Sequence, residues 1–164
     1  IWGIEAAVNN ASYLGATSGD ELVITSITKS GASKSATAEE AGCAQVDANV
    51  VVATRKGDVI TSCIIDAVQS KAEFGADGVV TTEAGNVASK NQLGENYGMK
   101  GFSGIGKEWN EQAAAFAAYA TGKTTEEVVG TALTETTAPA EADLASSVTI
   151  SIGGFIALIE KSAK

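Results

Sequence analysis

The chain has 164 residues, of which 45% are hydrophobic and 19% charged, a length and composition suited to one folded domain with its own core. Its 20 acidic and 11 basic residues give a net charge of −9, which disfavours binding to nucleic acid or anionic lipid. There is no histidine, and the two cysteines lack metal-ligand spacing, so we expect no histidine-based catalytic residues and no metal site.

The first half of the chain predicts strands. Residues 1–20 are mostly small and polar, so we expect a loosely organised N-terminal segment, followed by a single domain over residues 21–164. Leu22–Lys29 (LVITSITK) is rich in β-branched residues that alternate with polar ones, which predicts a strand. Residues 30–42 are rich in Ser, Ala, Gly and Glu and predict a loop, with a short helix near residues 38–40.

A β-hairpin is the clearest prediction of the sequence. The even-numbered residues from Val46 to Thr54 fall on one face of a strand, with Asp47, Asn49 and Arg55 on the other. Lys56-Gly57 then supplies a turn, and Val59–Ile65 returns. Residues 72–82 (AEFGADGVVTT) predict a second, shorter hairpin that turns at residues 76–78. Cys63 is expected to be a small buried residue of the returning strand. The sequence allows both a disulfide between Cys43 and Cys63 and two free cysteines. Four aspartates around these hairpins are expected to be turn and surface charges: Asp47, Asp58, Asp66 and Asp77.

The second half of the chain has helical periodicity. In KEWNEQAAAFAAYATG, apolar residues recur at helical spacing up to a stop at Gly122, and Thr124 with Glu127 forms a capping-box pattern. After a loop over residues 131–142, a last helix is predicted from about Ser151. Its buried residues are expected to be Ile152, Phe155, Ile156 and Ile159. Strands first and helices later predict an α+β domain, an antiparallel sheet with C-terminal helices packed on it. No apolar run is long enough to cross a bilayer.

The glycine-rich stretch YGMKGFSGIGKEW allows two interpretations. Gly104 and Gly106 precede a helix, where backbone amides hold anions in other proteins. A dinucleotide fingerprint needs a third glycine where this chain has Trp109, so a loop with unusual backbone angles is the simpler alternative. Tyr97, Phe102 and Trp109 cluster there and suggest the aromatic wall of a pocket.

The closing segment ADLASSVTISIGGFIALIEKSAK is the best candidate for a ligand site. Ser151 is expected to cap the last helix, and hydroxyls at Ser146, Ser147 and Thr149 lie just before it. Gly153 and Gly154 leave the first turn open to a negative group, which the helix dipole favours. Helix capping with close packing against the sheet explains the same residues without a ligand.

The residues DLASSVTIS resemble the closing motif of the FMN-binding domain family, D-x-x-S-G-A-T-x-[ST], at Asp143, Ser146, Thr149 and Ser151. In flavinylated members of that family the motif threonine carries FMN through a phosphoester bond, so the resemblance implies FMN at Thr149. Ser147 and Val148 stand where the family has Gly and Ala, a departure that adds bulk where the phosphate would approach. The resemblance implies these cofactor-binding residues: Asp143, Ser146, Thr149, Ser151, Gly153 and Gly154, with Tyr97, Phe102 or Trp109 beside the flavin ring.

From Glu21 onward the chain is also similar to exported proteins and lipoproteins of Gram-positive bacteria. This similarity implies an extracellular or cell-surface domain whose leader is missing from the present sequence. Two functions follow as expectations. The first is an FMN-binding domain that carries flavin in extracytoplasmic electron transfer, with a redox partner at the membrane. The second is a non-catalytic cell-surface binding or structural domain that keeps the fold and has lost flavin.

Overall fold

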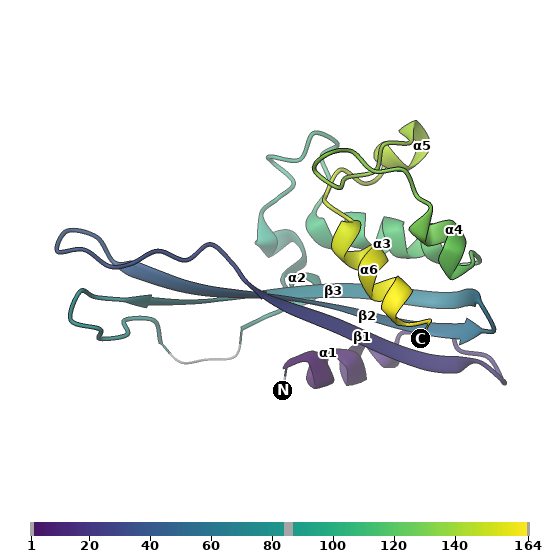
Figure 1. The fold of residues 1–164 in the computed structure, drawn as a ribbon, viewed down its shortest axis with the longest axis horizontal. Helices are drawn as coiled ribbons and strands as arrows, with labels where there is room; N and C mark the ends of the chain where they lie inside the picture. The colour runs from purple at the N-terminus through teal and green to yellow at the C-terminus, as the bar shows by residue number, and fades with distance from the viewer. Residues whose placement is uncertain (1, 84–86, 164) are drawn as a thin grey trace.

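The computed structural model describes residues 2–83 and 87–163 and shows an antiparallel three-stranded sheet with helices packed on it (Figure 1). The predicted α+β class with an antiparallel sheet is therefore confirmed. The elements in chain order are α1 (Trp2–Ala11), β1 (Glu21–Ser30), β2 (Gly42–Lys56), β3 (Val59–Phe74), α2 (Lys90–Leu93), η1 (Gly94–Tyr97), α3 (Trp109–Ala120), α4 (Thr125–Val129), α5 (Ala142–Ala145) and α6 (Gly153–Lys161). The short helical segments α2, η1 and α5, which were not predicted from the sequence, link the larger elements.

The sheet has the order β1-β2-β3, so β1 and β3 are both edge strands. The predicted hairpin is confirmed: β2 and β3 pair antiparallel around Gly57, whose φ of 61° suits a glycine in a tight turn. The register shifts between Thr54 and Arg55, where a bulge places one extra residue on β3.

The far ends of β2 and β3 project beyond the helices as a long ribbon (Figure 1). The predicted turn near Asp77 is present, since the Gly78 amide donates to the Gly75 carbonyl at 2.9 Å. The expected short helix near residues 38–40 is wrong. That segment is a bend, in which the Thr37 hydroxyl accepts the Glu40 amide at 3.0 Å and so replaces helical bonds.

Helices α3, α4 and α6 cover one face of the sheet and enclose the main core. Trp109 and Phe155 meet edge to face there, with ring centroids 5.9 Å apart. The four residues predicted to be buried in the last helix are all buried: Ile152, which is the N-cap residue of α6, and Phe155, Ile156 and Ile159. The apolar residues at helical spacing along α3 are buried as well: Trp109, Ala113, Phe116 and Ala120. Gly122 ends α3 with a φ of 86°, and the Thr124–Glu127 capping box opens α4 as predicted.

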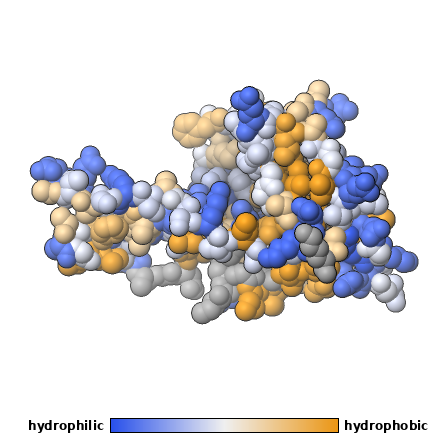
Figure 2. Space-filling view, viewed as in Figure 1, coloured by the Kyte–Doolittle hydropathy of each residue, from blue (hydrophilic) through white to orange (hydrophobic). Residues whose placement is uncertain are grey.

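Helix α1 lies on the opposite face of the sheet, which corrects the expectation that residues 1–20 are loosely organised (Figure 1). Ala6 packs against Val50 and Val52 of β2 and forms a small second core. Figure 2 shows apolar residues on the outer side of this layer, where Ile4 and Val8 are 72% and 67% exposed. No helix in the described residues has the length and hydrophobicity that a bilayer-spanning helix needs.

Candidate functional site

The closing motif, which we define as residues 143–154, runs from α5 through a loop into the start of α6. Asp143 is exposed in α5, and its carbonyl oxygen accepts a hydrogen bond from Ser146 Oγ at 2.6 Å. Thr149 is also exposed, whereas Val148 beside it is fully buried. Val148 therefore anchors the loop in the core, which gives a structural reason for a larger residue at this position.

Gln112 of α3, which is fully buried, holds the closing motif in place. Its Oε1 accepts three hydrogen bonds, from the Thr149 amide at 2.8 Å, the Thr149 hydroxyl at 3.1 Å and the Ile150 amide at 3.2 Å. Its Nε2 donates to Ser103 Oγ and to the Lys107 carbonyl, both at 3.1 Å. Gln112 was not among the site residues predicted from the sequence. A lone glutamine on the buried face of an alanine-rich helix is the signal that points to it.

The prediction that Ser151 caps the last helix is wrong. Helix α6 begins at Gly153, its N-cap residue is Ile152, and no side chain caps it. The Ser151 hydroxyl is hydrogen-bonded instead to that of Thr137, a residue with a φ of 60° in the preceding loop. A Cβ on Gly153 would lie 3.0 Å from Thr137 Cβ, so close packing explains this glycine.

In the described structure, the first turn of α6 has free backbone amides of the kind that bind a phosphate group. The amides of Gly153 and Gly154 have no hydrogen-bond acceptor among the described residues. They point along the positive end of the helix dipole. This part of the closing motif therefore fits the phosphate of FMN.

The three aromatic residues do not form a ring-binding wall. The Lys90 ammonium lies 4.6 Å from the ring centroid of Tyr97 and 4.9 Å from that of Trp109, so these two share one cation. Trp109 is only 6% exposed because it packs in the core, whereas Phe102 is 93% exposed on a loop. The structure thus brings Tyr97 and Trp109 together and leaves Phe102 apart. These residues do not fit the ring of FMN.

In the glycine-rich stretch the structure supports the loop interpretation. Gly98 and Gly106 have positive φ values of 76° and 64°. The backbone amides of Met99 and Lys100 each donate to the carboxylate of Glu108 at 2.9 Å. Glu108 is itself 98% buried, at 2% exposure, so these amides serve an internal carboxylate.

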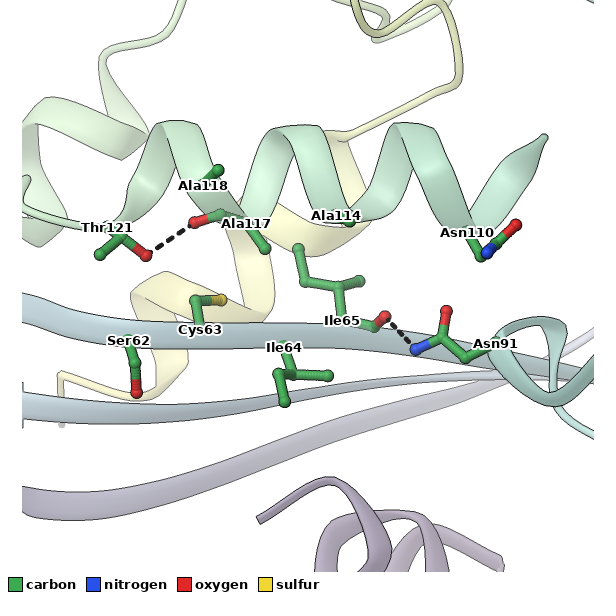
Figure 3. A pocket seen from close by; sticks show the side chains of 10 residues that line it. All are labelled: Ser62, Cys63, Ile64, Ile65, Asn91, Asn110, Ala114, Ala117, Ala118 and Thr121. Carbon is green, nitrogen blue, oxygen red and sulfur yellow. Dashed lines mark hydrogen bonds between the residues drawn. The ribbon is translucent and has the colours of Figure 1, made fainter. Parts of the chain in front are cut away.

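A groove of about 250 Å³ lies between strand β3 and helix α3 (Figure 3). It includes none of the residues predicted for the flavin site. Small side chains of α3 form one wall, and β3 forms the floor. The residues that line it are Ser62, Cys63, Ile64, Ile65, Asn91, Asn110, Ala114, Ala117, Ala118 and Thr121.

The groove follows a gap in the pairing of the β3 edge. At one end, the amide and carbonyl of Ile60 bond to the Lys123 carbonyl and the Gly122 amide, at 2.9 and 2.8 Å. At the other end, Asn91 Nδ2 donates to the Ile65 carbonyl at 2.9 Å (Figure 3). Since backbone groups alternate in direction along an antiparallel strand, those of Cys63 point outward as those of Ile65 do. In the described structure, the Cys63 amide and carbonyl and the Ile65 amide have no partner.

The side chains of the groove are suited to contact and not to nucleophilic chemistry. Burial raises the pKa of the Cys63 thiol from 9.0 to about 12, so the thiol stays protonated at neutral pH. Asn110 Oδ1 is a buried acceptor that lacks a donor among the described residues. The groove therefore offers unpaired hydrogen-bonding groups without an activated nucleophile.

Two further buried charged groups, Asp66 and Arg55, lie outside the groove and were not predicted to be buried. Asp66, expected at the surface, is 3% exposed and accepts the amides of Ala67 and Asn91 at 2.8 and 3.1 Å. Arg55 is 4% exposed, and its guanidinium donates to Thr125 Oγ1 at 2.7 Å and to Ser162 Oγ at 3.1 Å. Both connect separate elements and act as structural groups.

The structure also bears on the cysteines and on metals. Cys43 and Cys63 are both free, and the register places Cys43 opposite Glu73 but Cys63 opposite Ala53. Cys43 and Ala53 are separated along β2 by roughly 33 Å at about 3.3 Å per residue, which is too far for a disulfide. Within residues 2–83 and 87–163, no cluster of His, Cys, Asp or Glu is arranged to hold a metal ion.

Comparison of the chain with protein-family models, with curated proteins and with solved structures gives no match.

Proposed function

We propose that this chain is a non-catalytic binding domain whose groove takes an extended peptide as an additional strand on β3. The observation that carries this proposal is the gap at Cys63, where an edge strand presents an unpaired amide and carbonyl on the floor of a groove. Addition of a strand to an exposed sheet edge is a recurrent mode of peptide recognition, in which main-chain hydrogen bonds supply much of the affinity.

The chain itself supplies the pattern that the peptide would continue. Gly122 and Lys123 pair with both backbone groups of Ile60, as one residue of an added strand would. Asn91 bonds to the Ile65 carbonyl, as a peptide amide would. The peptide would therefore lie between Ile60 and the Ile65 carbonyl, which already have hydrogen-bond partners. It would bond to the amide and carbonyl of Cys63 and to the Ile65 amide.

The walls of the groove define the chemistry of the peptide. None of the described residues that line the groove is charged, so an uncharged peptide fits best. Ala114, Ala117 and Ala118 leave room on the helix side for apolar side chains of moderate size. A donor on the peptide would also satisfy the buried Asn110 Oδ1.

A display library of short random peptides tests this proposal. Peptides selected on the whole chain are synthesised and titrated by calorimetry against the parent and against Ala118→Phe, which fills the groove from an exposed position. Ala157→Phe on α6, another exposed helical alanine, is the matched control. We expect Ala118→Phe to abolish binding and Ala157→Phe to preserve it. Failure to select any binder, or equal binding by both variants, would contradict the proposal.

Flavin carriage is the second candidate, and one observation favours it. The exposed Thr149 side chain lies four residues before the unpaired Gly153 amide, so the phosphate end of FMN has suitable partners. Co-expression with a bacterial FMN transferase, followed by intact mass and visible absorbance, tests it. An added FMN mass that Thr149→Ala removes would support flavin attachment, and an unmodified mass would reject it.

A further inference from the structure

The other edge of the sheet, strand β1, presents ten residues whose outer side has no strand partner in the described structure. The register of the sheet shows which backbone groups of β1 point outward, starting from those of β3. Because the Ile65 carbonyl points away from β2, its opposite residue Val51 faces β1 and bonds with Thr25. Ser26 therefore faces outward, and the contact of Lys161 Nζ with the Ser26 carbonyl at 3.4 Å agrees.

The outward backbone groups are thus those of the even-numbered residues from Leu22 to Ser30. The strand also exposes apolar side chains: Leu22 is 51% exposed, Ile24 45% and Ile27 46%. A long edge strand with exposed apolar residues and no proline is a ready template for pairing with another chain.

The sequence of β1 is complementary to itself in one antiparallel register. When two copies pair about a two-fold axis at Thr25, Glu21 of each copy faces Lys29 of the other, and Val23 faces Ile27. In the neighbouring registers that keep outward groups opposite each other, Glu21 faces Ile27, or Lys29 faces Val23. Opposite charges and β-branched residues are favourable cross-strand pairs, so the register with two Glu–Lys pairs is selected.

We propose that β1 is the interface of a homodimer, in which the β1 strands of two copies pair antiparallel and join the two sheets into one. The occupant of this edge is a second copy, because Glu21 and Lys29 at the two ends of the strand complement each other when β1 pairs antiparallel with itself. The pairing uses the outward groups of the strand and leaves the β3 groove at the opposite edge of each sheet free. It therefore stands independently of the proposed peptide site.

Sedimentation velocity over a range of protein concentrations tests the dimer. We expect a concentration-dependent dimer, and charge reversal by Glu21→Lys or by Lys29→Glu to raise its dissociation constant by roughly tenfold or more, since two pairs become like-charged. The double variant E21K/K29E restores opposite charges and is expected to recover the parent value within about threefold. Glu39→Lys and Lys100→Glu change the net charge equally at exposed positions outside β1 and serve as controls.

Ser26→Pro provides a second variant, because it removes an outward amide that has no partner among the residues that the structure describes. Circular dichroism checks that it folds, and we expect it to be monomeric. A parent chain that stays monomeric at every concentration would overturn the proposal. A dimer that the β1 charge reversals affect no more than the controls do would overturn it as well.

Discussion

The closing motif and the β3 groove differ in how their polar groups are satisfied. In the closing motif, the hydroxyls that suggested a ligand site are bonded within the fold, Thr149 to Gln112 and Ser151 to Thr137. In the groove, the main-chain groups of Cys63 and the Asn110 side-chain oxygen lack partners within the described chain. The closing motif, which is rich in polar side chains, is thus largely closed, in the sense that its hydroxyls already have hydrogen-bond partners. The groove, lined mainly by Ala and Ile, is open, because several of its hydrogen-bonding groups have none in the described chain.

This difference shows that side-chain polarity alone does not locate a binding site. A hydroxyl close to a buried amide is used for stability, because an unsatisfied buried group costs more than a bond adds. An edge strand, in contrast, carries donors and acceptors whatever its side chains are. The available hydrogen-bonding capacity of this molecule therefore lies mainly in its backbone.

The largest expected effect concerns the reactivity of Cys63 on the groove floor. With a pKa of about 12 in place of 9.0, its thiolate fraction at pH 8 falls about a thousandfold, and labelling by a thiol reagent slows accordingly. The measurement is the labelling rate in a Cys43→Ser background, with the urea-unfolded chain as reference. The rate should rise with pH towards pH 12. Labelling as fast as in urea would show that the floor is not desolvated.

The same pKa predicts an alkaline loss of stability. Between pH 9.0 and about 12 the unfolded chain releases the Cys63 proton while the folded chain retains it. Because the unfolded state then binds fewer protons, the free energy of unfolding falls as pH rises through this window. Urea unfolding at stepped pH should show a smaller loss in Cys63→Ala than in the parent, and equal losses would contradict the prediction.

Two proline substitutions on β3 test which backbone groups are free. Ile64→Pro removes an amide that faces β2 and is expected to cost about 3 kcal/mol or to prevent folding. Cys63→Pro removes an outward amide that has no acceptor in the described part of the chain, and it is expected to cost about 1 kcal/mol. Urea unfolding of both variants measures the difference. Equal losses would mean that the two amides have the same environment.

Gln112→Leu tests whether the closing motif is held from within. The leucine leaves the amides of Thr149 and Ile150 without their acceptor, so we expect a loss of about 2–4 kcal/mol in the free energy of unfolding. Asn91→Leu is a matched change of an amide side chain at the groove and removes a single hydrogen bond, the one to the Ile65 carbonyl. Asn91→Leu is therefore expected to lose less free energy of unfolding than Gln112→Leu. A Gln112→Leu variant as stable as the parent would remove the reason for calling the motif closed.

Thr149→Val is expected to have the smallest effect, because it removes one hydroxyl bond and keeps the backbone contacts of the loop. The expected loss is about 1 kcal/mol, measured by urea unfolding. Thr149 is exposed, so the new methyl group adds no crowding in the core. A loss as large as that of Gln112→Leu would mean that the Thr149 hydroxyl, and not the amides of Thr149 and Ile150, provides most of the stabilisation of the loop.

Much of the fold could be predicted from the sequence, because local patterns determine it. The hairpin at Gly57, the helix from Trp109 to Ala120 and the capping box at Thr124 all follow from periodicity and turn chemistry. The N-cap of α6 was misplaced, since the partner of the Ser151 hydroxyl, Thr137, is distant in sequence and could not be inferred.

The site was harder to predict because it depends on contacts between distant segments. The buried state of Asp66 arises only when α1 and α2 pack around β3, and nothing in its neighbouring residues indicates this. The gap at Cys63 depends on where Asn91 and Gly122 end their pairing with the strand edge. A strand edge has no side-chain pattern of its own, so the groove became visible only in three dimensions.

Amide hydrogen exchange followed by NMR tests the central comparison most directly, because one experiment observes both regions. We predict slow exchange for the amides of Thr149 and Ile150, which bond to Gln112, and fast exchange for that of Cys63, which has no acceptor in the described structure. Fast exchange at Thr149 and Ile150 together with protection at Cys63 would contradict this comparison, since the closing motif would then be open and the groove closed.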